Sequence, residues 1–212
     1  MSAADLVTAI QEQKPHYKIT FNGRESLYVS AKLLQERSLA IGDELSLAEY
    51  REWLLPRQYP LALNDAVRLL SVRARSEREL QQKLQARRYL EDTVEMVLYK
   101  LEKEKLVDDA AFAAEWASAR AAQKLGKRRI YQELLQKGVS SDTAQAACDA
   151  LPDGADGAVD QAAKLLRRYA NEPDSRKTLD KVMQGLQRRG FDFNEAREAV
   201  RGAIQRMKDD EA

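Results

Sequence analysis

The sequence has very little of the residues on which most metal, disulfide and nucleophile chemistry depends. Among its 212 residues there is one cysteine, Cys148, and one histidine, His16. One cysteine excludes an intrachain disulfide, and a single distant Cys–His pair is a poor basis for a zinc site or a nucleophile–base pair. We therefore expect no metal and no cofactor, a packed thiol at Cys148, and a solvated strand end at His16.

Two further absences concern phosphate-binding loops and long apolar runs. The sequence contains no G-x-x-x-x-G-K-[ST] motif and no G-x-G-x-x-G motif after a strand, so nucleotide binding has no support. No apolar run reaches the roughly 18 residues of a membrane-spanning helix, and the N-terminus lacks the layout of a signal peptide. We expect a cytoplasmic, non-enzymatic protein without membrane contact.

Glycine and proline, which interrupt helices, are also scarce. There are 9 Gly and 5 Pro among abundant Ala, Leu, Glu, Gln, Lys and Arg, a composition that favours α-helix. Lys plus Arg (35) nearly balance Asp plus Glu (34), giving a net charge of +1. This balance excludes a polybasic tail as the means of binding nucleic acid but leaves open a basic stripe on one face.

The first 60 residues differ in kind from the rest. The run from Tyr17 to Phe21 alternates, Asn22-Gly23 follows, and a second β-favouring run begins at Leu27. Asn-Gly between two such runs is a strong hairpin signal, because the tight turn needs positive φ. A later helix, capped by Ser46, is expected to end before Pro56 and Pro60.

Beyond residue 64 the sequence shows only helical periods, and these return about every 50 residues. In the first copy, Ser76 and Glu79 form an S-x-x-E capping box ahead of Leu80 and Leu84. Apolar residues recur at matching places: Leu80, Ile130 and Val182; Leu84, Leu134 and Leu186; Val94, Ala144 and Ala196; Val97, Ala147 and Ala199; Leu101, Leu151 and Ala203.

These patterns predict a mostly α protein. We expect three tandem three-helix repeats in a short curved solenoid, preceded by a small N-terminal β-hairpin with helices. The predicted boundaries are residues 1–60 for the N-terminal part, then 64–107, 108–151 and 158–206 for the repeats.

Each repeat has a corner between its second and third helices. Gly138 and Gly190 occupy two corners, and glycine commonly ends a helix in the left-handed conformation. Arg88 stands at the equivalent place in the first repeat, where positive φ would cost on the order of 1 kcal/mol. The helix after that corner is expected to be capped by Glu91 or Asp92.

Local clusters of cations are the only candidate binding chemistry. If the repeats stack, equivalent clusters line up along one side and meet a DNA backbone or an acidic protein surface. The alternative is that these cations only solvate the surface and complement helix dipoles. The candidate residues are Arg73, Arg75, Arg87, Arg88, Lys124, Lys127, Arg128, Arg129, Lys137, Arg188 and Arg189, of which Arg73, Arg75 and Lys127 to Arg129 are favoured.

Several stretches together resemble the RecX family of bacterial regulators of the RecA recombinase. The run from Ala66 to Leu80 resembles that family's first repeat, Leu106 to Ala113 matches its Leu-x-Asp-Asp-x-x-Phe-Ala motif, and Arg129 to Val139 looks like its second-repeat helix. Gly42 to Ser46 fits the family's lead-in. Arg88 departs from the pattern, because relatives have glycine there, and the third repeat matches least well.

The resemblance implies a monomeric, non-catalytic protein that lodges in the groove of the RecA–DNA filament. There it would limit filament growth, strand exchange and ATP hydrolysis in recombination, DNA repair and the SOS response, with weak contact to single- or double-stranded DNA. The alternatives are a general non-sequence-specific DNA-binding helical protein, a peptide-binding scaffold and, last, an enzyme.

Overall fold

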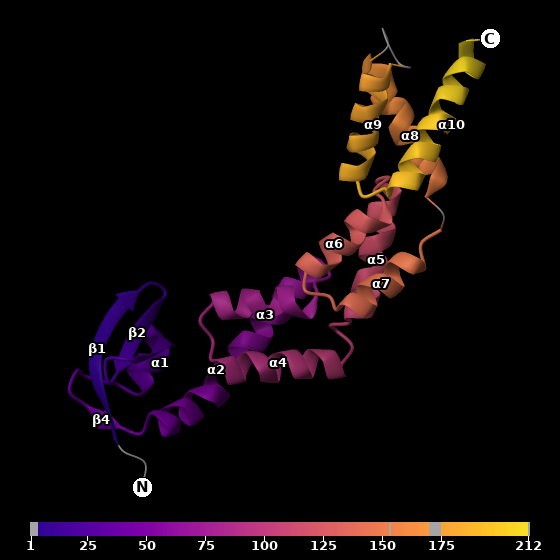
Figure 1. The fold of residues 1–212 in the computed structure, drawn as a ribbon. Coiled ribbons are helices and arrows are strands. Elements are labelled where there is room, and N and C mark those ends of the chain that lie inside the picture. The colour runs from indigo at the N-terminus through magenta and orange to yellow at the C-terminus, as the bar shows by residue number, and fades with distance from the viewer. Residues whose placement is uncertain (1–3, 153, 170–174, 212) are drawn as a thin grey trace. The chain divides into compact units, whose positions relative to one another are not determined.

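The computed structural model describes residues 4–152, 154–169 and 175–211. They form two compact units, the first ending at Val107 and the second beginning at Asp108 (Figure 1). The chain is mostly helical, with three successive three-helix groups after a small antiparallel sheet, which confirms the predicted fold class. None of the helices in the described ranges is long and apolar enough to cross a membrane.

The predicted hairpin is present and belongs to a larger sheet. Its strands order as β3-β2-β1-β4, all antiparallel, with bounds β1 (Asp5–Gln13), β2 (His16–Phe21), β3 (Glu25–Ser30) and β4 (Glu44–Leu45). Asn22 (φ 50°) and Gly23 (φ 67°) form the expected turn between β2 and β3. Strands β1 and β4 were not predicted from the sequence.

One face of this sheet is buried by two helices, α1 (Ala31–Glu36) and the first half of α2 (Leu47–Val72). Ile19, Phe21 and Val29 on the strands meet Tyr50 and Leu54 of α2 in one apolar cluster. The N-terminal sheet therefore shares a helix with the first repeat.

The prediction that a helix ends before Pro56 and Pro60 was wrong, because α2 continues through both prolines. Both are exposed, whereas Leu54, Gln58 and Ala62 between and beside them are buried. The carbonyls that lose their N–H partners thus face water, and burial of the other face keeps the helix continuous. The predicted boundary between residues 60 and 64 consequently falls inside a helix.

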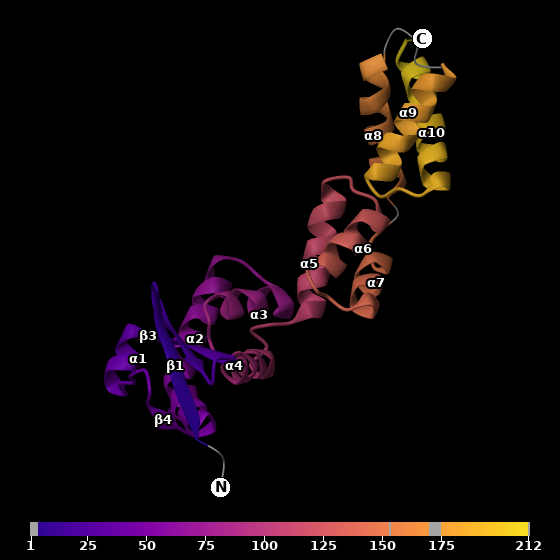
Figure 2. The same cartoon turned by 60° about the vertical axis from the view of Figure 1, so that its left-hand side comes forward.

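Each repeat consists of three helices, shown from two sides in Figures 1 and 2. The first uses the end of α2 with α3 (Glu77–Ala86) and α4 (Glu91–Lys103); the second has α5 (Asp109–Ala122), α6 (Lys127–Gln136) and α7 (Ser141–Asp149); the third has α8 (Ala155–Leu166), a 3-10 turn (Arg167–Tyr169), α9 (Arg176–Arg188) and α10 (Phe193–Glu211). The repeated apolar positions are buried in every repeat, except Leu151, which is half-buried.

The corners after α3, α6 and α9 adopt the predicted left-handed conformation. Gly138 has φ 85° and Gly190 has φ 94°, and Arg88 has φ 65° at the equivalent place. In the two glycine corners the next residue donates its amide back to the last turn, from Val139 to Leu134 and from Phe191 to Leu186. Arg88 thus occupies a conformation that favours glycine.

The predicted cap of α4 was wrong. Glu91 and Asp92 lie inside its first turn, the N-cap residue is Leu90, and no side chain caps the helix from that position. Instead the amide of Leu90 donates to Oε1 of Gln58, a buried residue of α2, at 2.9 Å. A long-range contact replaces a local one because the corner packs directly against α2.

Cys148 lies 2% exposed in the core of the second repeat, which confirms the predicted packed thiol. Burial, with the charge of Asp149 in addition, raises the pKa of the thiol. The thiol is therefore protonated and unreactive at neutral pH. Phe112 is buried in the same core, with Trp116 half-buried and stacked on it.

Replacing Arg88 by Gly and by Ala tests the strain at the first corner. Both variants lose the guanidinium, but only Ala retains a Cβ at positive φ. We expect Arg88→Gly to be more stable than Arg88→Ala by about 1 kcal/mol in urea unfolding. Equal stabilities of the two variants would show that the left-handed backbone costs nothing here.

Candidate nucleic-acid interface

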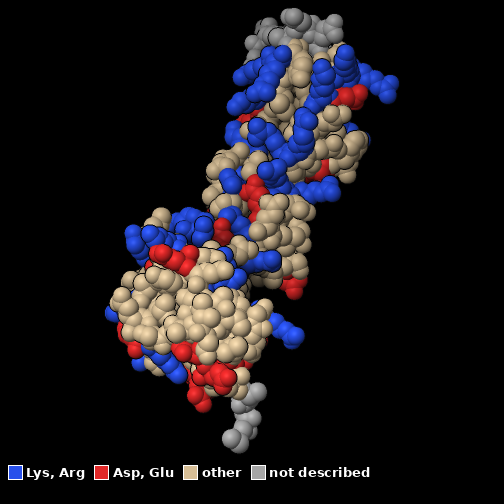
Figure 3. Space-filling view, turned by 90° about the vertical axis from the view of Figure 1, so that its left-hand side faces the viewer, with Lys and Arg blue, Asp and Glu red and all other residues tan. Residues whose placement is uncertain are grey.

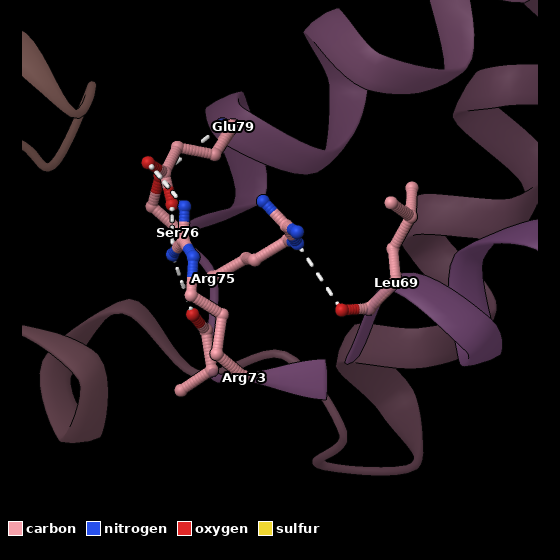
Figure 4. A network of polar contacts seen from close by, with 6 residues as sticks. Leu69, Arg73, Arg75, Ser76 and Glu79 are labelled. Carbon is pink, nitrogen blue, oxygen red and sulfur yellow. Dashed lines mark hydrogen bonds and ion pairs between the residues drawn. The ribbon is translucent and has the colours of Figure 1, made fainter. Parts of the chain in front are cut away.

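Arg73 and Arg75 are held by bonds within the first repeat (Figure 4). The Arg73 guanidinium forms two parallel bonds to the Glu79 carboxylate, at 2.9 and 3.1 Å, and a third to the carbonyl of Ala74. Nε of Arg75 donates to the carbonyl of Leu69 at 3.2 Å. Together they join the end of α2 to the start of α3, so both side chains have a structural role independent of any partner.

The two arginines at the first corner differ in their partners. Arg87 forms an ion pair with Asp65, which also accepts a hydrogen bond of 2.7 Å from the Tyr89 hydroxyl. Although burial acts to raise the pKa of Asp65, these two donors hold it below its usual range. Arg88 is exposed and lies over the ring of Tyr28, 4.6 Å from its centroid.

Several predicted cations of the second repeat are likewise engaged. Lys124 pairs with Asp160, which also accepts from Arg206 at 3.0 Å. Arg129 pairs with Glu133 at 3.1 Å. Nζ of Lys127 donates to the carbonyl of Leu151, and Nζ of Lys137 lies 3.9 Å from the centroid of the Trp116 ring. These contacts orient the cations. Lys124, Lys127 and Lys137 are half-buried and therefore only partly accessible to a partner.

The start of α6 lacks a cap of its own. Its N-cap residue is Gly126, which has no side chain to accept from the first turn. The corner after α9 supplies the acceptors instead: the amide of Gly126 donates to the carbonyl of Arg189 at 2.9 Å, and that of Arg128 donates to the carbonyl of Gly190 at 3.2 Å. The negative end of α9 thus meets the positive end of α6.

Glycine is required on both sides of this contact, which we call the α6–α9 junction. A Cβ on Gly126 would lie 2.3 Å from the carbonyl carbon and oxygen of Gly190. A Cβ on Gly190 would lie 2.3 Å from the backbone nitrogen and the Cβ of Arg129. Because real Cβ atoms do not approach backbone so closely, any larger residue would force the two backbones apart.

The junction brings together two basic clusters that are at least 59 positions apart in the sequence, Lys127-Arg128-Arg129 and Arg188-Arg189. Arg128 and Arg188 are exposed, and within the described part of the chain no ion pair engages either of them or Arg189. The contact joins the start of one helix to the end of another, not equivalent positions of two repeats. Repeat equivalence alone did not predict it.

Two further cations extend this surface along α9. Lys177, Lys181 and Arg188 are exposed and lie at spacings of four and seven, which places them on one face of the helix. Figure 3 shows Lys and Arg side chains crowding the α6 and α9 face of the second unit, with few Asp or Glu among them. Lys177 and Lys181 were not among the predicted site residues, although their helical spacing to Arg188 is readable from the sequence.

The arrangement suits binding of extended anions. Guanidinium and ammonium groups on neighbouring helix ends contact successive phosphates or carboxylates without reading base identity. Among the described residues, no three of the metal-ligating types His, Cys, Asp and Glu come close enough to hold a metal ion.

Comparisons with known proteins by sequence and by structure find members of the same family. Three family models match in order: "RecX, first three-helix domain" at residues 62–101, the second at 108–147 and the third at 153–200. A "Regulatory protein RecX" of Limosilactobacillus reuteri (strain DSM 20016) is 33% identical over 184 residues, covering 85% of this chain and 69% of the relative. One from Streptococcus pneumoniae (strain CGSP14) is 27% identical, covering 90% and 74%.

Comparison with solved structures agrees with the sequence comparisons. A "Crystal structure of regulatory protein RecX" superimposes with a TM-score of 0.64 and 30% identity, covering 93% of this chain and 98% of the other. RecX from Lactobacillus salivarius, at 24% identity and a TM-score of 0.66, shares the fold over 71% of this chain and 99% of its own. The resemblance inferred from the motifs is thereby confirmed, including the third repeat.

The Gly190→Ala and Gly23→Ala variants test the α6–α9 junction as a matched pair. Both place a Cβ at positive φ, but Gly23 has open space around its position and Gly190 does not. We expect Gly23→Ala to lose about 1 kcal/mol of unfolding free energy and Gly190→Ala about 1–3 kcal/mol more. Hydrogen exchange of the Gly126 and Arg128 amides should accelerate only in Gly190→Ala. Unchanged exchange there would mean that the corner does not cap α6.

Proposed function

The chain belongs to the RecX family, and on that premise we propose that it regulates the RecA recombinase. It binds the filament that RecA forms on DNA, limits filament growth, and so lowers strand exchange and ATP hydrolysis during recombination and repair. It acts in the cytoplasm as a monomer and without catalysis of its own. The relatives' name, "Regulatory protein RecX", supports a regulatory role.

The observation that carries this proposal is the group of cations at the α6–α9 junction. Arg128, Arg188 and Arg189 have no acidic partner among the described side chains, whereas Arg73, Arg87, Lys124 and Arg129 are each paired with an acid. A cation held near like charges gains more electrostatic interaction energy from an incoming anion than a cation that is already paired with an acid. The surface therefore offers contacts to phosphates of the filament DNA or to carboxylates of the filament protein.

The overall charge balance argues for a filament rather than bare DNA as the target. With a net charge of +1, the chain has no long-range attraction to DNA, so a handful of phosphate contacts gives weak, salt-sensitive affinity. A filament adds protein contacts to those phosphates, and the two together supply the affinity that either lacks. Arg73, Arg75 and Arg87 then serve chiefly to hold the first repeat together.

The same basic face also supports the second candidate, a general DNA-binding protein that acts without the recombinase. Fluorescence-anisotropy titrations at two or three salt concentrations distinguish the two functions. A filament regulator binds the RecA–DNA filament much more tightly than bare DNA at physiological salt. Equal affinity for both, with the same steep salt dependence, would favour the second candidate.

Charge reversal at the junction tests the proposed contact surface. In the Arg128→Glu/Arg188→Glu variant two exposed cations become acids, and neither change removes an intramolecular ion pair of the described chain. We expect the concentration that half-inhibits the DNA-dependent ATPase of RecA to rise at least tenfold, a loss of about 1.4 kcal/mol. Circular dichroism should show unchanged helicity.

Arg197→Glu/Arg201→Glu is the matched control, because it makes the same change in net charge on α10 of the same unit. These arginines lie beside Glu198, so their charge is partly compensated in the wild type. The control should inhibit within about twofold of wild type, since only general electrostatics changes. If both double variants lose inhibition equally, the junction is not the contact surface.

A further inference from the structure

A small cavity of about 200 Å³ lies in the first unit, between the sheet, α2 and the corner after α3. Its polar lining comes from three separate elements: His16 and Ser30 from the sheet, Gln58, Asn64 and Asp65 from α2, and Arg88 and Tyr89 from the corner. Leu33 and Leu61 form its apolar wall. This volume is below the roughly 300–1,000 Å³ of sites for drug-sized ligands, so the cavity suits a single chemical group.

The charges facing the cavity do not cancel. Asp65 is the one acid among the lining residues, and its carboxylate is already bound by the Arg87 guanidinium and the Tyr89 hydroxyl. Arg88 has no ion pair among the described residues and is held in place by the Tyr28 ring and by its left-handed backbone. The lining therefore presents one uncompensated guanidinium beside a histidine.

The pKa of His16 is affected by this excess of positive charge. Contrary to the expectation of a solvated strand end, its side chain is half-buried in the cavity wall. Burial, and then the charge of Arg88, lower the pKa of His16 below its usual range. The imidazole is thus neutral at neutral pH, and a negative charge beside it would favour the protonated form.

Hydrogen-bond donors are available around the same space. The Ser30 hydroxyl accepts from the amide of Leu33, which leaves its own proton free to be donated. The amide of Asn64, on the exposed side of α2, adds two more donor hydrogens. Arg88, Asn64, Ser30 and a protonated His16 together match the acceptor-only surface of an oxyanion.

We propose that this cavity binds a single oxyanion group, a carboxylate or a tetrahedral phosphate-like anion, between Arg88 and His16. The anion pairs with Arg88 in place of Asp65, because the Asp65 carboxylate is already bound to Arg87 and Tyr89. Binding favours the imidazolium form of His16, so affinity increases as the pH falls through the pKa of His16 in the complex. The cavity lies in the first unit, whereas the α6–α9 junction lies in the second.

The experiment uses the only histidine of the sequence as its probe. The Hε1 resonance of His16 is followed by proton NMR against pH in sodium chloride, in sodium sulfate and in sodium acetate at equal ionic strength. We expect sulfate, acetate or both to raise the pKa of His16 saturably by about one unit, since an opposite charge within hydrogen-bonding distance has that effect. Sulfate stands in for phosphate and acetate for a carboxylate side chain, so the larger shift identifies the source.

Arg88→Gly and Lys83→Gln serve as test and control variants. Arg88→Gly removes the guanidinium while relieving positive φ, so the corner keeps its conformation. Lys83→Gln removes an exposed cation of α3 that does not line the cavity. The saturable shift should disappear in the first and persist in the second. A pKa of His16 that no anion raises, or the same shift in Arg88→Gly, would overturn the proposal.

Discussion

In the second unit, the start of α6 and the end of α9 are hydrogen-bonded to each other. The α6 helix has no side chain to cap its first turn, and α9 ends in carbonyls that need donors. Each end satisfies the other through two backbone hydrogen bonds, and this is possible only because glycine stands on both sides. A polar side chain at position 126 would cap α6 locally but would collide with the backbone of Gly190.

This contact has an electrostatic consequence. By joining two helix ends it also gathers the basic residues that flank them, Lys127 to Arg129 and Arg188 to Arg189. Like charges at about 4 Å repel by roughly 1 kcal/mol in water and more near protein. The fold tolerates this repulsion because Arg128 and Arg188 are exposed to water and Arg129 is paired with Glu133, and a bound anion would lower it further. Electrostatic repulsion among these cations thus makes the surface suited to binding an anion.

Local patterns in the sequence predicted much of the fold because local physics governs those features. The apolar period placed Leu80, Ile130 and Val182 in equivalent buried positions, and the corners showed where positive φ occurs, including at Arg88. What was missed depends on long-range contacts: β1 pairs with β2 and β4, α2 continues through Pro56 because its other face is buried, and Gln58 accepts from the amide of Leu90, 32 residues away.

The candidate site likewise has features that could be predicted from the sequence and features that could not. Clusters of Lys and Arg were visible in the sequence, but their ion pairs were not, so Arg73 and Arg128 looked alike. The structure separates them, since Arg73 is bound by Glu79 and Arg128 has no acidic partner among the described side chains. The predictive signal that was overlooked is the spacing of Lys177, Lys181 and Arg188 on one face of α9.

The most direct test of the central claim is the DNA-dependent ATPase of RecA, measured on preformed and growing filaments with this protein present well below one molecule per protomer. A regulator that acts on the filament should lower the rate far more than its molar ratio, and more strongly when added during filament growth. If the rate is unchanged, or falls only when the protein covers the DNA stoichiometrically, filament regulation is contradicted.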